Sequence, residues 1–331
     1  MLINENSFSS QSEISKVKPD KNVDSVEGLG KYATIYFRWF INNFRDKRLE
    51  EKKERQRRQL DLLSFIKKGF NKTKIMKDYE KVLELRENDA LGKNPQAMIF
   101  EHIVTENIEL HNWLGDSALT YKTTEYDDRI NHTDLVVEWD GEEGMEPIRL
   151  AIDCTIAESE EVLDKKVGYI VKELNNLRMT KIKYFESDID NTAKTIQDVP
   201  RIILAIDRNK LEELCKDFIN LSVADSAWQE NYLQLFFLRE VEEQLIMQLK
   251  LLEKDDKNIK YLLSRHTDYS KEKIMSLSDK LKTLLELIRK IIKEKTDAMP
   301  EDTLARVKKY IANAKAPELI KKYYQQAITN K

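Results

Sequence analysis

The sequence is poor in glycine, proline, cysteine and histidine, and these shortages argue against several classes of protein. Its 331 residues include eight glycines, six prolines, two cysteines and four histidines. No glycine-rich phosphate-binding loop or nucleophile elbow is found. Cys154 and Cys215 are too few for a disulfide framework or a zinc cluster, and the histidines lack the spacing of metal ligands. Phosphate-loop enzymes, serine hydrolases of the elbow type and zinc proteins are therefore disfavoured.

Long hydrophobic runs are also missing. No apolar stretch approaches the roughly 18 residues that span a bilayer, charged residues make up 35% of the chain, and the mean hydropathy is -0.60. The first residues, MLINENSFSSQSE, lack the basic start and apolar centre of a secretory signal. These features predict a cytoplasmic protein that makes no membrane contact.

Charge of neither sign dominates, because the net charge is only -3, but the two signs are unevenly distributed. Basic residues outnumber acidic ones by about two to one between Lys31 and Arg86, and the ratio is reversed between Pro95 and Pro200. A basic arm beside an acidic core suits nucleic acid, because the arm can neutralise phosphates while carboxylates hold a cation. It suits equally well an arm that folds back on its own core.

The composition along the chain predicts four regions. Residues 1–28 are polar without an apolar pattern and are expected to form a disordered tail. Residues 29–93 are expected to form a basic helical arm, since aromatic residues that follow Lys31 lead into densely charged helical sequence. Residues 94–209 are expected to be an α/β core, and residues 210–331 a helical region.

Within the core, the pattern changes from helical to extended and back. Pro95 lies at the expected first turn of a helix. The segments ALTYKTTEY, TDLVVEW and IRLAIDCTIA follow as strands, separated by the turn-like DDRIN and DGEEGMEP. A helix then begins after Ser159, with an apolar stripe from Val162 to Leu174. RIILAI, residues 201–206, is a buried strand, and residues 182–185 form a short one. The expected order is helix, three-stranded meander, helix and further strand.

The region after Lys210 carries two helical apolar stripes. One stripe consists of Leu238, Val241, Leu245, Leu249 and Leu252, and the other of Ile274, Leu277, Leu281, Leu284, Ile288 and Ile291. Antiparallel packing of two helices within one chain would cover both stripes. The same stripes could be the seam of a homo-oligomer, and their length does not decide between the two.

Two aspartates on neighbouring expected strands form the candidate site. In LAIDCTIA, alternation places Asp153 and Thr155 on the face opposite Cys154. An ionised aspartate inside an apolar strand is costly unless something compensates its charge, and a metal ion would do so. Asp134, near the start of the preceding strand, would supply a second carboxylate. Hard oxygen ligands of this kind suit Mg²⁺ or Mn²⁺ better than zinc.

The segment from about Pro95 to Asp207 resembles the PD-(D/E)XK nuclease superfamily. The resemblance lies in the order of its elements: a helix with a glutamate, hairpin strands that carry Asp134 and Asp153, a second helix, and the strand RIILAI. The resemblance implies a divalent-metal-dependent nuclease that acts on DNA or RNA. It implies that Asp134 and Asp153 bind the metal and that the backbone carbonyl of Cys154 joins them. A glutamate of the first helix would complete the set, with Glu101 as the best candidate and Glu106 as its substitute.

The sequence departs from the superfamily at the lysine of its motif. Thr155 stands two positions after the second acid, where the superfamily has the lysine that offsets the charge of the transition state. Lys165 or Lys166, early in the following helix, could take over this role, as in superfamily members whose lysine has migrated. The sequence does not rank the two lysines.

Structural roles remain open for each of these residues. Asp134 could cap a turn, Asp153 could be a structural acid satisfied by a lysine or arginine, and Glu101, Lys165 and Lys166 could be solvated surface residues. The alternative function is therefore a catalytically inactive nuclease fold that binds nucleic acid or protein through its helices. A third interpretation is a helical assembly protein in which the strands are a small addition.

Overall fold

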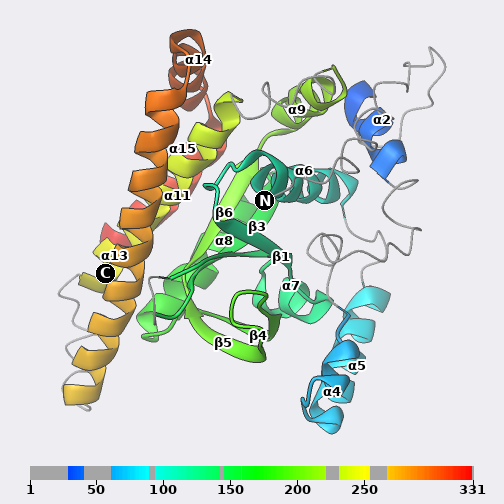
Figure 1. The fold of residues 1–331 in the computed structure, drawn as a ribbon, viewed down its shortest axis with the longest axis vertical. Coiled ribbons are helices and arrows are strands. Elements are labelled where there is room, and N and C mark those ends of the chain that lie inside the picture. The colour runs from blue at the N-terminus through cyan, green and yellow to red at the C-terminus, as the bar shows by residue number, and fades with distance from the viewer. Residues whose placement is uncertain are drawn as a thin grey trace.

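The chain has a mixed α/β fold in which helices surround a small central sheet (Figure 1). The computed structural model describes residues 29–40, 61–88, 94–141, 145–157, 159–220, 231–253 and 267–329. The tail expected over residues 1–28 and the charged helix expected after Arg45 lie outside these ranges.

The central sheet has four strands in the order β1-β2-β3-β6. Strands β1 (Ala118–Lys122), β2 (Leu135–Trp139) and β3 (Ile148–Ile156) form the expected antiparallel meander, and β6 (Arg201–Ile206) pairs with β3 in parallel. Helix α6 (Pro95–His111) precedes the meander, and α8 (Glu160–Asn175) lies between β3 and β6 in the chain. The predicted order of these elements is confirmed.

The two faces of the sheet are covered differently. Leu135, Val137 and Ile152 pack in the main core with residues of α6. Tyr121, Val136 and Ala151 lie on the other face and pack against a hairpin of β4 (Thr180–Glu186) and β5 (Ala193–Val199). Strand β4 extends the short strand expected over residues 182–185. Strand β5 is new, because AKTIQDV lacks a clear apolar alternation.

One predicted strand end and turn form a helix instead. Residues of TTEY and DDRIN form α7 (Glu125–Asn131), whose N-cap Thr124 accepts a hydrogen bond from the Asp127 amide at 3.3 Å. The buried Asp127 carboxylate also accepts hydrogen bonds from the amides of Lys183 (2.7 Å) and Tyr184 (3.0 Å), and thereby ties α7 to β4. The Thr-x-x-Asp capping pattern is the sequence signal for this helix.

The apolar stripe of α8 begins one residue later than expected. Leu163, Val167, Ile170 and Leu174 are buried, whereas Val162 is exposed. Ser159 caps the helix by accepting a hydrogen bond from the Val162 amide at 3.4 Å. Val162 therefore lies in the first turn, on the solvent side of the helix.

The described helices of the N-terminal arm pack on the core. Helix α2 (Lys31–Phe40) lies beside α6 and α9 (Arg208–Asn220), and the Glu212 carboxylate of α9 accepts from the amides of Tyr32 (2.5 Å) and Ala33 (2.9 Å). A carboxylate at the N-terminus of a helix is favoured by the helix dipole.

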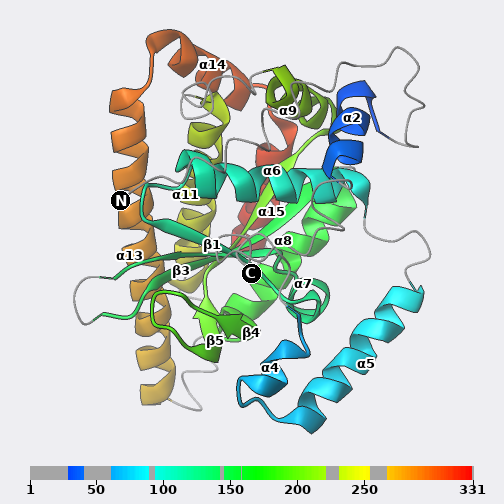
Figure 2. The same cartoon turned by 45° about the vertical axis from the view of Figure 1, so that its right-hand side comes forward.

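Helices α4 (Ser64–Lys67) and α5 (Lys72–Asn88) dock lower on the core, beside α7 and β4 (Figure 2). The Asp78 carboxylate of α5 accepts from the Tyr184 hydroxyl at 2.6 Å and pairs with Lys183. Arg86 pairs with Glu125 of α7. The described part of the arm therefore folds back on the core.

The two apolar stripes of the C-terminal region are buried within the chain, except at Ile274, which is half-buried. Helices α11 (Tyr232–Glu253) and α13 (Thr267–Ala298) run side by side in opposite directions (Figures 1 and 2). Ion pairs confirm the antiparallel register, since Arg289 contacts Glu242 at 2.9 Å and Lys282 contacts Glu253 at 3.2 Å. Helices α14 (Glu301–Ile311) and α15 (Lys315–Thr329) follow.

Side chains from helices close both edges of the central sheet. Gln244 of α11 accepts from the Ile203 amide at 2.9 Å and donates to the Ile203 carbonyl at 2.7 Å. Gln248, one helical turn later, donates to the Arg201 carbonyl at 2.8 Å. At the opposite edge, the Thr120 amide donates to the Glu109 carboxylate of α6. These contacts supply partners for backbone groups that an edge strand otherwise leaves unpaired.

Among the helices of the described ranges, none combines the length and apolar character that crossing a membrane requires.

A buried acid on α11 predicts a pH-dependent stability. Burial raises the pKa of Glu240 from its ordinary 4.5 to about 8, Glu243 adds to this effect and Lys321 opposes it. The folded state favours the protonated carboxyl of Glu240. The contribution of this carboxyl to the free energy of unfolding is therefore fully present below pH 4.5 and is lost as the pH rises through about 8. We expect Glu240→Gln to flatten the fall in the free energy of unfolding between pH 5 and pH 9, measured by urea denaturation.

The exposed Glu253 on the same helix provides the control. Glu253→Gln should keep the pH dependence of the wild type. Identical pH profiles for Glu240→Gln and wild type would show that Glu240 does not titrate in this way.

Candidate functional site

The two candidate aspartates lie opposite each other on neighbouring strands. Leu135 pairs with Ile152 in the antiparallel register of β2 and β3, so Asp134 stands beside Asp153. The Asp134 amide donates to the Ile152 carbonyl at 2.9 Å, and its carboxylate accepts from the Cys154 amide at 2.7 Å. Asp134 is half-buried and Asp153 is buried. The hairpin thus brings together the two acids that the sequence singled out.

Lys166 is the lysine that reaches these acids. Its ammonium contacts the Asp153 carboxylate at 2.5 Å, and its side chain is 23% exposed. Burial acts to lower the pKa of Lys166, but the charge of Asp153 and its hydrogen bond outweigh burial, so the pKa lies above its usual value. The Asp134 charge acts in the same direction. Lys166 is therefore protonated at neutral pH and places a positive charge beside the acids.

Lys165 points to a different neighbour. It is exposed, and its ammonium lies 6.0 Å from the centroid of the Tyr169 ring. The Tyr169 ring also stacks with the ring of His132, with centroids 4.4 Å apart and an angle of 18° between the ring planes. Burial lowers the pKa of His132, although the charge of Asp153 opposes this effect. His132 therefore lies within electrostatic reach of the site, beside the acids rather than on them.

Thr155 stands two positions after Asp153 on β3 and carries no charge. It is buried, and alternation along β3 puts it on the same face as Asp153. Thr155 therefore brings no positive charge to Asp153. The positive charge that contacts Asp153 belongs to Lys166, which comes from helix α8.

Glu101 of α6, the candidate third metal ligand, takes part in an ion pair. Glu101 pairs with Lys122 of β1 at 3.0 Å. Lys122 alternates with Tyr121, which packs toward the β4–β5 hairpin, so the ion pair lies on the α6 side of the sheet. Asp153 shares its face with Ala151, which packs toward the hairpin. Alternation thus assigns Lys122 and Asp153 to opposite faces of the sheet, while the charges of both Glu101 and Asp153 reach the Cys154 thiol.

Glu106 and Cys154 are buried on the α6 side. The Glu106 carboxylate lies 3.9 Å from a ring nitrogen of His102. Its charge also helps to raise the pKa of the Tyr36 hydroxyl on α2, so Glu106 faces the arm. Burial raises the pKa of the Cys154 thiol well above its usual value, and Asp134, Glu101 and Asp153 add to the effect. The thiol is therefore protonated, and only the backbone of Cys154 can serve the site.

Arg201 is a residue of the site region that the sequence did not indicate. It begins β6 and is 3% exposed. Its guanidinium donates to the Asn131 carbonyl at 2.5 Å and to the Glu173 carboxylate at 3.1 Å. Asn131 precedes His132, which adopts a left-handed backbone conformation with φ 53° immediately before the turn into Asp134. Arg201 thus holds the segment that positions Asp134. An arginine at the start of a buried strand is a weak signal for this role.

Two carboxylates of the candidate site could bind a divalent cation. Asp134 and Asp153 supply hard oxygens of the kind that Mg²⁺ or Mn²⁺ prefers, and such ions commonly keep several waters. Across the described ranges, no group of three or more His, Cys, Asp and Glu side chains is arranged to hold a metal ion. A cation could be held here by the two aspartates, with water or a phosphate as its other ligands.

Comparisons with protein families, with curated proteins and with solved structures found no match to this chain. The geometry of the site therefore carries the functional argument.

Proposed function

We propose that this protein is a divalent-metal-dependent nuclease-like enzyme that hydrolyses phosphodiester bonds in DNA or RNA. The observation that carries the proposal is the contact of Lys166 with Asp153, beside Asp134, in a hairpin whose motif lysine is replaced by Thr155. Two acids and one lysine are the groups that the PD-(D/E)XK superfamily uses, and here the lysine comes from the following helix. The element order of the core supports the same superfamily assignment.

In the proposed site, Asp134 and Asp153 hold Mg²⁺ or Mn²⁺. The bound ion supplies neutralisation of phosphate charge and activation of water. Lys166 offsets negative charge that develops on the phosphoryl group. The Cys154 amide orients the Asp134 carboxylate, and Arg201 holds the preceding turn. Glu101 is given no direct role in this proposal, because its carboxylate is engaged in an ion pair with Lys122.

A specific observation favours the alternative, an inactive nuclease fold that binds nucleic acid or protein. Each candidate carboxylate already has a partner within the chain: Lys166 for Asp153, the Cys154 amide for Asp134 and Lys122 for Glu101. A metal would have to compete with Lys166 for Asp153. Titration with Mn²⁺ separates the two functions, because a scaffold of this kind would show no saturable binding that depends on Asp153.

Assembly into a homo-oligomer through the C-terminal helices stays a prediction. The two stripes that suggested it pack on each other within the chain, so an oligomer would use other faces of α11 or α13. Light scattering over a range of protein concentrations would test it.

The neighbouring lysines provide a matched test of the proposed function. We expect Lys166→Gln to lower the rate of metal-dependent cleavage about ten- to a hundredfold, because it removes the charge beside the acids. Lys165→Gln removes the same charge one residue away, from an exposed side chain that contacts Tyr169, and should leave the rate within about twofold of the wild type. Cleavage would be measured on single- and double-stranded DNA and RNA with Mg²⁺ or Mn²⁺.

Lys166→Arg should recover part of the lost rate, since it restores the charge. Equal losses in Lys165→Gln and Lys166→Gln would contradict the specific role of Lys166 and indicate a general effect of helix charge on substrate binding.

A further inference from the structure

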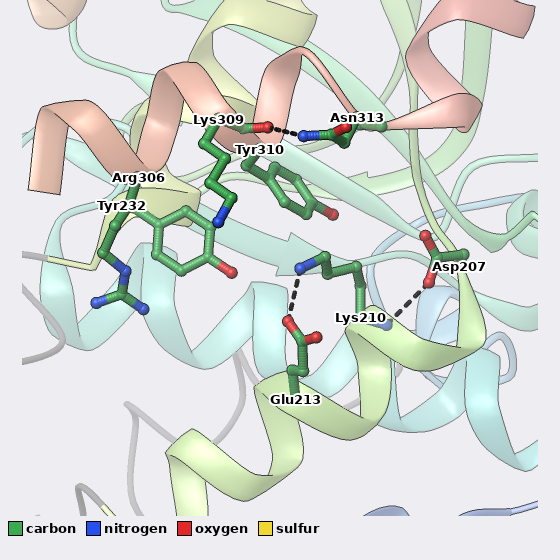
Figure 3. A pocket seen from close by; sticks show the side chains of 9 residues that line it. Asp207, Lys210, Glu213, Tyr232, Arg306, Lys309, Tyr310 and Asn313 are labelled. Atoms are coloured by element: carbon green, nitrogen blue, oxygen red, sulfur yellow. Dashed lines mark hydrogen bonds and ion pairs between the residues drawn. The ribbon is translucent and has the colours of Figure 1, made fainter.

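A cavity lies apart from the two aspartates, at the carboxyl end of β6. It has a volume of about 290 Å³, opens to solvent, and is lined by residues from the start of α9, the first turn of α11 and the end of α14 (Figure 3). Asp153 pairs with Ile203, and Asp207 follows four residues further along the chain, after the last residue of β6. The cavity is therefore offset along the strand from the candidate site.

Two tyrosines form the aromatic wall of this cavity. The rings of Tyr232 and Tyr310 meet edge to face with centroids 5.6 Å apart. Arg306 lies 4.7 Å from the Tyr232 centroid, and Lys210 lies 4.6 Å from that of Tyr310. Burial raises the pKa of Tyr232 to about 12 and that of Tyr310 further. Both hydroxyls are therefore protonated at neutral pH and can donate hydrogen bonds.

The charged groups at one end of the cavity are already engaged with each other. Lys210 turns toward Glu213 and contacts it at 2.6 Å (Figure 3). The Asp207 carboxylate accepts from the Lys210 amide at 2.9 Å and so caps α9. Asp207 and Glu213 keep lone pairs that could accept from a hydroxyl group of a ligand.

The cations at the other end lie farther from carboxylates, although the charge of Asp217 on α9 interacts with that of Arg306. Arg306 and Lys309 are three residues apart on α14 and both line the cavity. Within the residues that the structure describes, neither makes an ion pair with a carboxylate. Lys308 lies between them in sequence. All three side chains are exposed, but Lys308 does not line the cavity. Favourable interaction with the helix dipole explains basic residues in the last turn, but Arg306 precedes that turn.

We propose that this cavity binds a small phosphate monoester, with the phosphate against Arg306 and Lys309 and a hydroxyl of the ligand near Asp207 or Glu213. A phosphate monoester carries a charge of about -1.5 to -2 near neutral pH, which two cations match. The guanidinium fork suits phosphate oxygens. The cavity volume lies near the lower end of about 300 to 1,000 Å³ that is typical of small-molecule sites. The proposal does not depend on nuclease activity.

Isothermal titration of the full chain with inorganic phosphate, ribose 5-phosphate and adenosine 5′-monophosphate tests the proposal. We expect saturable binding of at least one of the two esters, tighter than that of inorganic phosphate. Arg306→Gln and Lys309→Gln should each weaken binding of that ester about tenfold, the loss of one charge-assisted contact. Lys308→Gln, with the same change of charge on the same helix, should alter binding less than twofold.

Three outcomes would overturn the proposal. The first is the absence of saturable binding of both esters by the wild type. The second is an equal loss of affinity in Lys308→Gln and Lys309→Gln, which would indicate a diffuse electrostatic attraction. The third is inorganic phosphate binding as tightly as both esters, since the acidic end of the cavity would then contribute nothing. Lys309→Gln keeps the test decisive if Arg306→Gln loses the contact with Tyr232 and unfolds.

Discussion

Replacing Asp153 by asparagine is expected to lower metal-dependent cleavage of nucleic acid by at least about a hundredfold. Asparagine keeps the shape of the side chain but loses the charge that would hold a divalent cation. It also loses the ion pair with Lys166, which is part of the same proposed site. Cleavage of DNA and RNA, single- and double-stranded, with Mg²⁺ or Mn²⁺ measures the effect. Thermal unfolding followed by circular dichroism shows whether the variant keeps its fold.

Asp164 on α8 provides a matched control, because it is exposed and close to Lys166 in sequence. Asp164→Asn should cleave like the wild type. Equal cleavage by Asp153→Asn and wild type would point to a contaminating nuclease. No cleavage by the wild type on any substrate would favour the inactive scaffold. Loss of folding in Asp153→Asn would instead assign Asp153 a structural role, with Lys166 as its satisfying partner.

Replacing Gln244 by leucine is expected to lower the free energy of unfolding by about 2 to 6 kcal/mol. Gln244 is buried and bonds both the amide and the carbonyl of Ile203. Leucine has a similar size but leaves both backbone groups without a partner, and each buried unpaired group costs about 1 to 3 kcal/mol. Urea denaturation of both proteins at one pH measures the difference.

Lys250→Leu is the control for added apolar surface, because Lys250 is exposed on the same helix. It should change the free energy of unfolding by less than about 1 kcal/mol. A cost below about 1 kcal/mol for Gln244→Leu would mean that water or a shift of α11 replaces the amide contacts.

Periodicity predicted the elements that have a clear apolar pattern. The stripe from Leu238 to Leu252 and the run RIILAI are helix and buried strand, as expected. It failed where polar contacts decide the conformation. Helix α7 depends on its Thr124 cap, and β5 depends on pairing with β4 rather than on its own sequence. A capping side chain and a partner strand stabilise an element without any apolar repeat of its own, so neither leaves a periodic signal.

The candidate site shows the same division. Alternation and an acid within an apolar strand suggested Asp134 and Asp153, which the hairpin places side by side. The choice between Lys165 and Lys166 required the rotation of α8 about its axis, which is set by burial of Leu163 and Val167. The position of Glu101 required the side of the sheet on which α6 packs. Neither quantity can be obtained from spacing alone.

The contacts that close the edge of β6 have a consequence for synthesis of the chain. The side chain that bonds Ile203 lies 41 residues further along the chain, in α11. When a ribosome releases the strands of the sheet, this helix has not yet emerged, so the outer edge of β6 is exposed to other nascent chains. Open edges recruit strands from neighbouring molecules. The interval before α11 docks is therefore the stage at which a chaperone would protect this protein most.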